Sequence, residues 1–301
     1  MIAICIPVYN HLIADLIKPL QDEITNYELP AKIIVLDDYS IPEIREKNRQ
    51  SCPKSVNYIE LEANIGRAAI RNRFLHLSTQ PYLLFLDCDA KIIKEDFIRQ
   101  YLQLIEQEHS QIIFGGICFN NTPPPKHNRL RWLYGIKRES ATAEKRHQHP
   151  NRSFKTKNFL ISRQLFEQIQ FDERITGYGH EDTLFGYRLQ QAGIMISHAN
   201  NPVMNAEPED NATYLEKTEK AMDNLFYILQ IIEYPDQFAQ TIRLIKYYRN
   251  IQKSGLAWLA RFSFPVFGKS LRRILIHFPS LPLFDLYKLL YFSAFRPKIN
   301  A

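Results

Sequence analysis

The sequence predicts an α/β fold in which helices flank a mostly parallel sheet, followed by a helical C-terminal extension. Three observations lead to this prediction. Short apolar runs alternate with helical patterns through the first half of the 301-residue chain, which is typical of β-α-β units. Several of the apolar runs end in polar residues, as strands do when they lead to a ligand-binding edge. From Asn211 onward only helical patterns follow.

The predicted elements follow one another in a regular order. The strands and helices of the first half are, in turn, "IAICIP", "DLIKPLQDEI", "KIIVLDD", "VNYIELE", "GRAAIRNRFLHL", "YLLFLD", "EDFIRQYLQLIEQEH" and "QIIFGGICF". The pattern then weakens over residues 120–157, which contain three consecutive prolines and ten Lys or Arg against two acids. We expect a long functional loop there. Order resumes with "TKNFLISRQLFEQI", a glycine-punctuated loop, a helix that ends at Gly193, and "IMISH".

Composition narrows the class of protein. The chain is 45% hydrophobic and has four cysteines, which are far apart and show no CxxC spacing. We therefore expect a globular protein of a reducing compartment without a zinc site or a disulfide framework. The apolar start "MIAICIPVYN" lacks a basic leader and a cleavage site, so it indicates a first strand and not a signal peptide.

Charge is distributed unevenly along the chain. The net charge is +6, but from Arg243 to the C-terminus there are eleven Lys or Arg and one acid, Asp285. The preceding residues have 27 basic and 31 acidic side chains, a balance of −4. This segregation argues against a general nucleic-acid surface and favours a local anionic partner of the C-terminal region.

Two carboxylates end the run "YLLFLDCD". Side chains alternate faces along a strand, so Asp87 and Asp89 project to the same side where the strand leaves the core. Their mutual repulsion would be relieved by a cation, and oxygen donors suit Mg²⁺ or Mn²⁺. The alternative is that these acids only solvate the strand end and cap the next helix.

A second acidic motif lies in "GYGHEDTLFGYRL". Gly177 and Gly179 allow the backbone to bend closely around a ligand. Glu181 and Asp182 fall in the first turn of the following helix, where the helix dipole favours negative charge. A capped helix without a catalytic role is the alternative interpretation.

Residues 1 to about 205 resemble glycosyltransferase family 2. The resemblance rests on four stretches in order: "IPVYN", "IIVLDDYS", "NIGRAAIRN" with "LLFLDCDA", and "GYGHED". It implies the GT-A fold, a Rossmann-like sheet, over residues 1–205, with a nucleotide-binding half (1–110) and an acceptor-side half (111–205). Residues 206–301 would form the helical, basic and aromatic C-terminal region.

The resemblance also implies roles for individual residues. Nucleotide contacts would come from Pro7, Tyr9 and Asp38 at the base and ribose, Arg71 at the diphosphate, and Asp87 near the sugar or ribose. Asp89 would bind Mn²⁺ or Mg²⁺ together with Asp87. Asp182 would be the general base, and Glu181 would hold the acceptor or the sugar hydroxyls.

This sequence departs from the family pattern at two positions. Tyr39 in "DDYS" stands where the family often has glycine, which puts the local turn and the base pocket in question. Asn205 stands where many relatives carry a histidine that ligates the metal. His198, seven residues earlier, is the candidate substitute, although a histidine there also fits a simple polar strand end.

The C-terminal region combines aromatic and basic residues. Residues 258–298 contain ten aromatic side chains, and "GKSLRRILIHF" places apolar residues at helical spacing with Lys269, Arg272 and Arg273 between them. The pattern favours a helix lying at a membrane interface and is too interrupted to span a bilayer. Packing of these helices onto the catalytic domain is the alternative.

The sequence thus predicts an inverting, metal-dependent glycosyltransferase. We expect the donor to be a UDP-sugar, the acceptor a cell-surface glycan or glycolipid, and the location the cytoplasmic face of an anionic membrane. One alternative is a sugar nucleotidyltransferase, although a glycine-rich phosphate loop is missing near the first strand. The other is a non-enzymatic protein that binds membrane or nucleic acid, which would leave the cleft carboxylates unexplained.

Overall fold

The computed structural model describes residues 1–108, 110–255 and 257–295 and divides the chain into two units. The first unit comprises Met1–Asn120, Ser140–Thr176 and Glu181–Ala206. The second comprises Asn121–Glu139, Gly177–His180 and Glu207–Ala301. The second unit therefore includes two short segments that lie within residues 1–205, the range expected from the sequence to form a single catalytic domain.

The first unit is built on a seven-stranded sheet of order β3-β2-β1-β4-β8-β6-β9. All neighbouring pairs are parallel except β4 with β8 and β6 with β8, since β8 runs antiparallel to both. This sheet confirms the predicted fold class. Its strands are β1 (Ile2–Val8), β2 (Ala31–Asp37), β3 (Asn57–Glu60), β4 (Tyr82–Leu86), β6 (Ile112–Phe114), β8 (Asn158–Ser162) and β9 (Ser197–His198).

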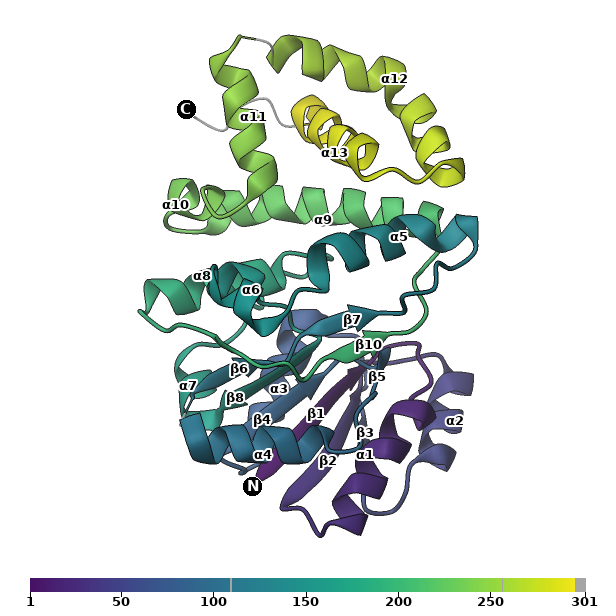
Figure 1. Ribbon diagram of the computed structural model, residues 1–301, viewed down its shortest axis with the longest axis vertical. Helices are drawn as coiled ribbons and strands as arrows, with labels where there is room; N and C mark the ends of the chain where they lie inside the picture. Colours follow the sequence, from purple (N-terminus) through teal and green to yellow (C-terminus); the bar gives the residue numbers. More distant parts are fainter. Residues whose placement is uncertain (109, 256, 296–301) are drawn as a thin grey trace. The chain divides into compact units, whose positions relative to one another are not determined.

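Helices cover both faces of this sheet. α1 and α4 lie in front of the strands in Figure 1, and α3 lies behind them. The chain must return from edge strand β3 to β4, beyond β1, and a right-handed connection places α3 on the face opposite α1. The helices of this unit are α1 (Ala14–Asn26), α2 (Pro42–Ser51), α3 (Arg67–Leu77), α4 (Phe97–Glu108), α6 (Ala143–His147), η3 (Asn151–Ser153), α7 (Arg163–Gln168) and α8 (Glu181–Gln191).

A three-stranded sheet of order β5-β10-β7 lies beyond the end of β4. Its strands are β5 (Ala90–Lys91), β7 (Ile117–Phe119) and β10 (Val203–Asn205). β10 pairs antiparallel with β5, and Asn205 is opposite Ala90. This register brings residue 205 next to the carboxylates that follow β4.

The second unit is helical. Its core contains one residue of α5, one of α9, one of α12 and two of α13: Leu130, Leu215, Leu275, Phe284 and Tyr287. The Asp210 side chain caps α9 by accepting the Ala212 and Thr213 amides. The elements are η1 (Lys126–Asn128), α5 (Arg129–Tyr134), η2 (Gly135–Glu139), α9 (Asn211–Ile231), α10 (Pro235–Ala239), α11 (Arg243–Lys253), α12 (Ala257–His277) and α13 (Leu281–Phe295).

The segment 120–157, predicted to be a long loop, contains several short helices. In the first unit it is held to the sheet by Arg146, whose side chain is buried. The guanidinium donates to Nδ1 of His198 at 3.1 Å and to the Ala199 carbonyl at 2.6 Å, and it lies over the Phe114 ring. Backbone carbonyl groups thus accept hydrogen bonds from this buried guanidinium, although the sequence predicts that the residue lies in a loop.

His198 is consequently a structural residue in this arrangement. Its Nδ1 accepts from Arg146, and its Nε2 lies 3.0 Å from the Pro150 carbonyl. Burial, assisted by the charges of Arg146 and His147, lowers the pKa of His198 to about 4. The imidazole is therefore neutral at physiological pH, and both of its nitrogens are occupied by protein groups.

This burial predicts a stability that depends on pH. The folded-state pKa of about 4 lies below the ordinary value of 6.5, so the unfolded chain binds more protons between these values. The free energy of unfolding should fall as the pH is lowered from 6.5 to 4, by at most about 3 kcal/mol from this residue. Denaturant titrations of wild type and His198→Gln at several pH values in this range measure the effect.

The variant should lose less stability than wild type on acidification, because it has no imidazole to protonate. The matched control is His76→Gln, which removes an exposed histidine and should follow the wild-type curve. An identical pH dependence in wild type and His198→Gln would contradict the assignment.

Candidate active site

Asp38 fixes the loop that enters α3. Its backbone amide donates to the Val8 carbonyl at 2.7 Å, and its carboxylate accepts the amides of Ile65 (2.7 Å) and Gly66 (3.1 Å). Burial raises the pKa of Asp38 and outweighs the opposing effect of these two amides. Gly66 has a φ of 85°, a value that glycine adopts without strain. A carboxylate at the end of β2 thereby orders the predicted "NIGR" motif.

Two exposed aromatic residues follow the ends of β1 and β2. Tyr9 is 55% exposed and Tyr39 is 50% exposed, and the Arg45 guanidinium lies 5.2 Å from the Tyr39 ring centre. Tyr39 adopts a φ of 65°, so the turn forms although tyrosine replaces the glycine that is frequent in relatives. Pro7 is partly buried in β1.

Arg71 joins the two acidic motifs of the first unit. It is 2% exposed, and it donates to Asp87 Oδ1 at 2.8 Å while lying 3.9 Å from Glu181 Oε1. Arg67, one helical turn earlier, lies 3.5 Å from the same Glu181 oxygen. Glu181 is 6% exposed, and its Oε2 has no hydrogen-bond partner among the described residues. A buried carboxylate oxygen in this state is suited to accept a ligand hydroxyl.

Asp182 is the second residue of α8, after Glu181, so both lie in the first turn as the sequence predicts. Its Oδ2 accepts from the Lys155 ammonium at 2.7 Å, and its Oδ1 accepts the amide and the hydroxyl of Thr183. The carboxylate is thus held in one orientation at the start of the helix.

The glycines of "GYGHED" approach a helix of their own unit. A Cβ on Gly177 would lie 2.7 Å from the Asn224 side-chain oxygen, and one on Gly179 would lie 2.6 Å from Ala221 Cβ. The Asn224 amide also donates to both glycine carbonyls. The glycine segment and α9 both belong to the second unit. Their close packing explains why residues 177 and 179 are glycines without the ligand that the sequence predicts.

Lys157 lies between Asp89 and Asn205. Its Nζ is 2.8 Å from Asp89 Oδ2 and 2.6 Å from Asn205 Oδ1. Burial raises the pKa of Asp89, but the Lys157 ammonium more than compensates, so the carboxyl titrates below its usual range. One amino group therefore bridges the second carboxylate of the predicted metal motif and the asparagine that replaces a histidine.

The predicted metal ligands are only partly brought together. No group of three or more His, Cys, Asp or Glu side chains among the described residues is placed to hold a metal ion, so Asp87, Asp89 and His198 do not form a joint site. The oxygen donors at the strand ends are the carboxylates of Asp87 and Asp89 and the amide of Asn205. Hard oxygen donors of this kind fit Mg²⁺ or Mn²⁺.

Sequence reasoning missed Lys155, Lys157 and Arg67. The two lysines directly precede β8, Lys157 lying in the turn that leads into the strand. β8 pairs antiparallel with β4, so Lys157 meets the residue that follows β4: its carbonyl accepts the Asp87 amide at 3.1 Å. The two lysines are visible in "FKTKNF", but the strand pairing is not.

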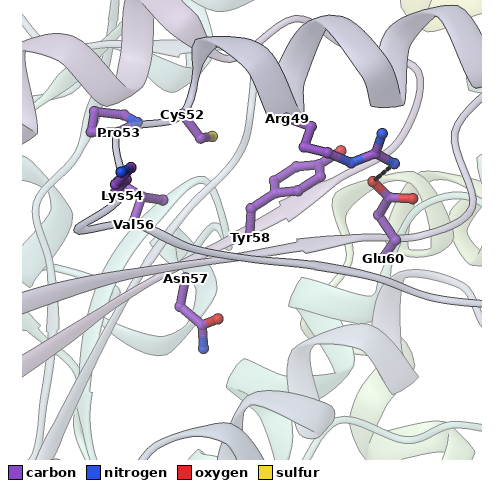
Figure 2. Close-up of a pocket in the computed structure, with 8 residues that line it drawn as sticks. All are labelled: Arg49, Cys52, Pro53, Lys54, Val56, Asn57, Tyr58 and Glu60. Carbon is purple, nitrogen blue, oxygen red and sulfur yellow. Dashed lines mark hydrogen bonds and ion pairs between the residues drawn. The ribbon is translucent and has the colours of Figure 1, made fainter.

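A separate depression lies at the sheet edge formed by β3 and α2 (Figure 2). Arg49 and Glu60 form an ion pair on its rim at 2.6 Å, and the Tyr58 ring lies beneath them. The other lining residues are Cys52, Pro53, Lys54, Val56 and Asn57. None of the predicted site residues lines it.

Comparison with known proteins identifies the family of this chain. Residues 3–170 match the family described as glycosyl transferase family 2. Chondroitin synthase of Escherichia coli is 25% identical over 227 residues, which are 64% of this chain and 32% of that protein. The chain therefore spans about a third of this curated relative's length.

Two solved structures share the fold. The mannosyltransferase PcManGT of Pyrobaculum calidifontis, in complex with GDP-Man and Mn²⁺, superposes with a TM-score of 0.55 at 14% identity and covers 97% of this chain and 85% of its own. TarS of S. aureus gives 0.51 at 17% identity, over 97% of this chain and 55% of its own. The family match favours the predicted family over the nucleotidyltransferase and non-enzymatic alternatives. With a seven-stranded GT-A-like sheet and a family match over residues 3–170, the chain belongs to glycosyl transferase family 2.

Proposed function

We propose that the protein transfers a sugar, with inversion, from a UDP-sugar to a hydroxyl of a cell-surface glycan or glycolipid. The observation that carries this proposal is the linkage of both acidic motifs through Arg71, from Asp87 to Glu181. The similarity to a chondroitin synthase supports a glycan acceptor. A single displacement by an acceptor hydroxyl inverts the anomeric configuration.

Donor binding is assigned to the strand ends. The exposed ring of Tyr9 and the neighbouring Pro7 and Asp38 would border the base and ribose. Arg71 is largely enclosed by Asp87 and Glu181, whereas the Arg67 side chain is 49% exposed one turn away. We therefore assign direct diphosphate contact to Arg67 and the orientation of Asp87 to Arg71.

A divalent cation, Mn²⁺ or Mg²⁺, would be held by Asp89 with Asp87 and Asn205, and it would supply charge neutralisation at the diphosphate. Glu181 Oε2, which no described residue contacts by a hydrogen bond, would accept a hydroxyl of the transferred sugar. Asp182 would remove the proton of the attacking hydroxyl. Its contact with the Lys155 ammonium at 2.7 Å would hold the carboxylate in position for this step.

The general-base assignment predicts a separation of chemistry from binding. Asp182→Asn keeps the shape of the side chain but removes the proton acceptor, so transfer should fall by about 10²-fold or more while UDP affinity stays nearly constant. Initial rates of transfer and calorimetric UDP titrations measure the two quantities. Asp15→Asn, an exposed carboxylate of α1, is the control.

Retention of most of the transfer activity by Asp182→Asn would exclude this residue as the base. Glu181→Gln then tests the alternative assignment. Under our proposal Glu181→Gln should mainly raise the KM for the sugar donor, since the lost contact is made to the bound sugar.

The cation site predicts that UDP binds more tightly with Mn²⁺ than without it. The gain should be modest, on the order of tenfold, because only one carboxylate and one amide face the cation beyond Asp87. Asp89→Ala should abolish the gain, and Asp22→Ala, an exposed residue of α1, should preserve it. Equal UDP affinity with Mn²⁺ and with a chelator in wild type would rule out a role for the metal in donor binding.

We also propose that the C-terminal region binds an anionic membrane, at the cytoplasmic face. No helix within the described residues is long and apolar enough to cross a bilayer. The aromatic residues of α12 are nevertheless strongly exposed: Trp258 is 59%, Phe262 is 65% and Phe267 is 57% exposed. Such a helix, with basic residues beside its aromatic side chains, fits the interface of an anionic membrane.

Two other basic residues, one in α12 and one in α13, have partners inside the unit. Arg272 pairs with Glu216 and Glu219. Lys288 pairs with Asp285 and lies over the Phe284 ring. The membrane-facing charges are therefore assigned to three exposed residues of α12, namely Arg261, Lys269 and Arg273.

Replacing Arg261, Lys269 and Arg273 with Gln should weaken binding to anionic vesicles at low salt by on the order of 100-fold, since each charge near such a surface contributes about 1 kcal/mol. Apolar contacts should keep part of the wild-type protein on the vesicles at high salt, and replacing Trp258, Phe262 and Val266 with Ser should remove this bound fraction. Co-sedimentation with vesicles measures both effects, and Tyr247→Ser, an exposed aromatic of α11, is the control. Wild-type protein that stays in the supernatant at low salt would refute membrane binding.

A further inference from the structure

The ammonium group of Lys157 lies against the oxygens that would hold a metal. Its two partners are Asp89 Oδ2 at 2.8 Å and Asn205 Oδ1 at 2.6 Å. The lysine is 8% exposed and Asn205 is 6% exposed. The contact therefore lies mostly away from solvent, where water cannot replace the ammonium as a partner of Asn205.

Lys157 and a divalent cation cannot use these oxygens together. A metal ion bound at about 2.1 Å from the same oxygens would lie next to the ammonium. Two positive charges at that separation repel strongly in a partly buried site. Occupation by one therefore excludes the other.

The backbone at Lys157 is fixed, whereas its side chain can move. The Lys157 carbonyl accepts the Asp87 amide at 3.1 Å, and β8 begins at the next residue. The four-carbon stem is flexible and leads to a single charged group. Rotation of this stem would move the ammonium away from both oxygens while the backbone stays in place.

We propose that Lys157 is an internal counter-ion that competes with the divalent cation for Asp89 and Asn205. The metal then binds only when the Lys157 side chain has left, and this lysine sets the metal affinity of the site. The proposal rests on the cation site of the proposed function. Under this proposal Lys157 shifts the equilibrium between the metal-bound and the metal-free form of the site.

Lys155 provides the matched control. It lies two residues earlier in the chain, and its Nζ pairs with Asp182 at 2.7 Å. Removing either lysine removes one positive charge from the first unit. Only removal of Lys157 vacates the oxygens of Asp89 and Asn205.

Direct titration of Mn²⁺, followed by calorimetry without any sugar donor, tests the proposal. Lys157→Met keeps the length of the side chain but removes its charge, and it should lower the Kd for Mn²⁺ at least tenfold. Lys157→Arg and Lys155→Met should remain close to wild type. In Lys157→Met/Asp89→Ala the gain should disappear, because Asp89 is the shared ligand.

The Asp89 side chain is 49% exposed, so water can solvate it after Lys157 is removed, and Lys157→Met should fold. A second measurement uses wild-type protein: Mn²⁺ should increase the rate at which Lys157 is acetylated by an amine reagent, as read by mass spectrometry. Unchanged Mn²⁺ affinity in folded Lys157→Met, or unchanged acetylation of Lys157, would overturn the proposal. Neither readout requires transfer activity, so an incorrect donor or acceptor assignment leaves the test intact.

Discussion

The ion pair of Arg71 with Asp87 is the interaction on which the site depends. Asp87 follows the carboxyl end of β4, and Arg71 reaches it from α3. Arg71 is almost fully buried. Removing one member of such a pair leaves an uncompensated charge in a poorly solvated place, which typically costs several kcal/mol. The same guanidinium approaches Glu181, so one cation orders the strand end and the start of α8 together. Charge compensation within the protein, before any ligand arrives, is therefore the first requirement of this arrangement.

Compensation extends to two other acidic residues near this edge. Lys157 faces Asp89, and Lys155 faces Asp182. Both lysines come from the segment that precedes β8, the strand that runs antiparallel to its neighbours in the sheet. In this sheet acidic residues follow the carboxyl ends of parallel strands and therefore lie close together. Because β8 is antiparallel, the segment before it lies at the same ends, and its two lysines reduce the repulsion between the carboxylates.

Much of this could be predicted from the sequence, because the signals were local. Alternating apolar runs predicted the sheet, and its observed order confirms the fold class. The positions of Asp87 and Asp182 after a strand and at the start of a helix were equally local. The lysine partners, the buried Arg146–His198 contact and the helix against Gly179 depend on residues that are 27 or more positions apart in the chain. No single window of sequence contains both members of such a pair.

The antiparallel entry of β8 also restricts how the chain can change in length. Thr156 and Lys157 form a turn directly before β8, and the Lys157 carbonyl accepts the Asp87 amide next to the Leu86–Asn158 pair. Loss or gain of one residue between Lys157 and Asn158 would move Lys157 out of this position, and with it the ammonium that faces Asp89. The electrostatics of the site are therefore encoded in the count of residues between Lys157 and β8 as much as in their identity.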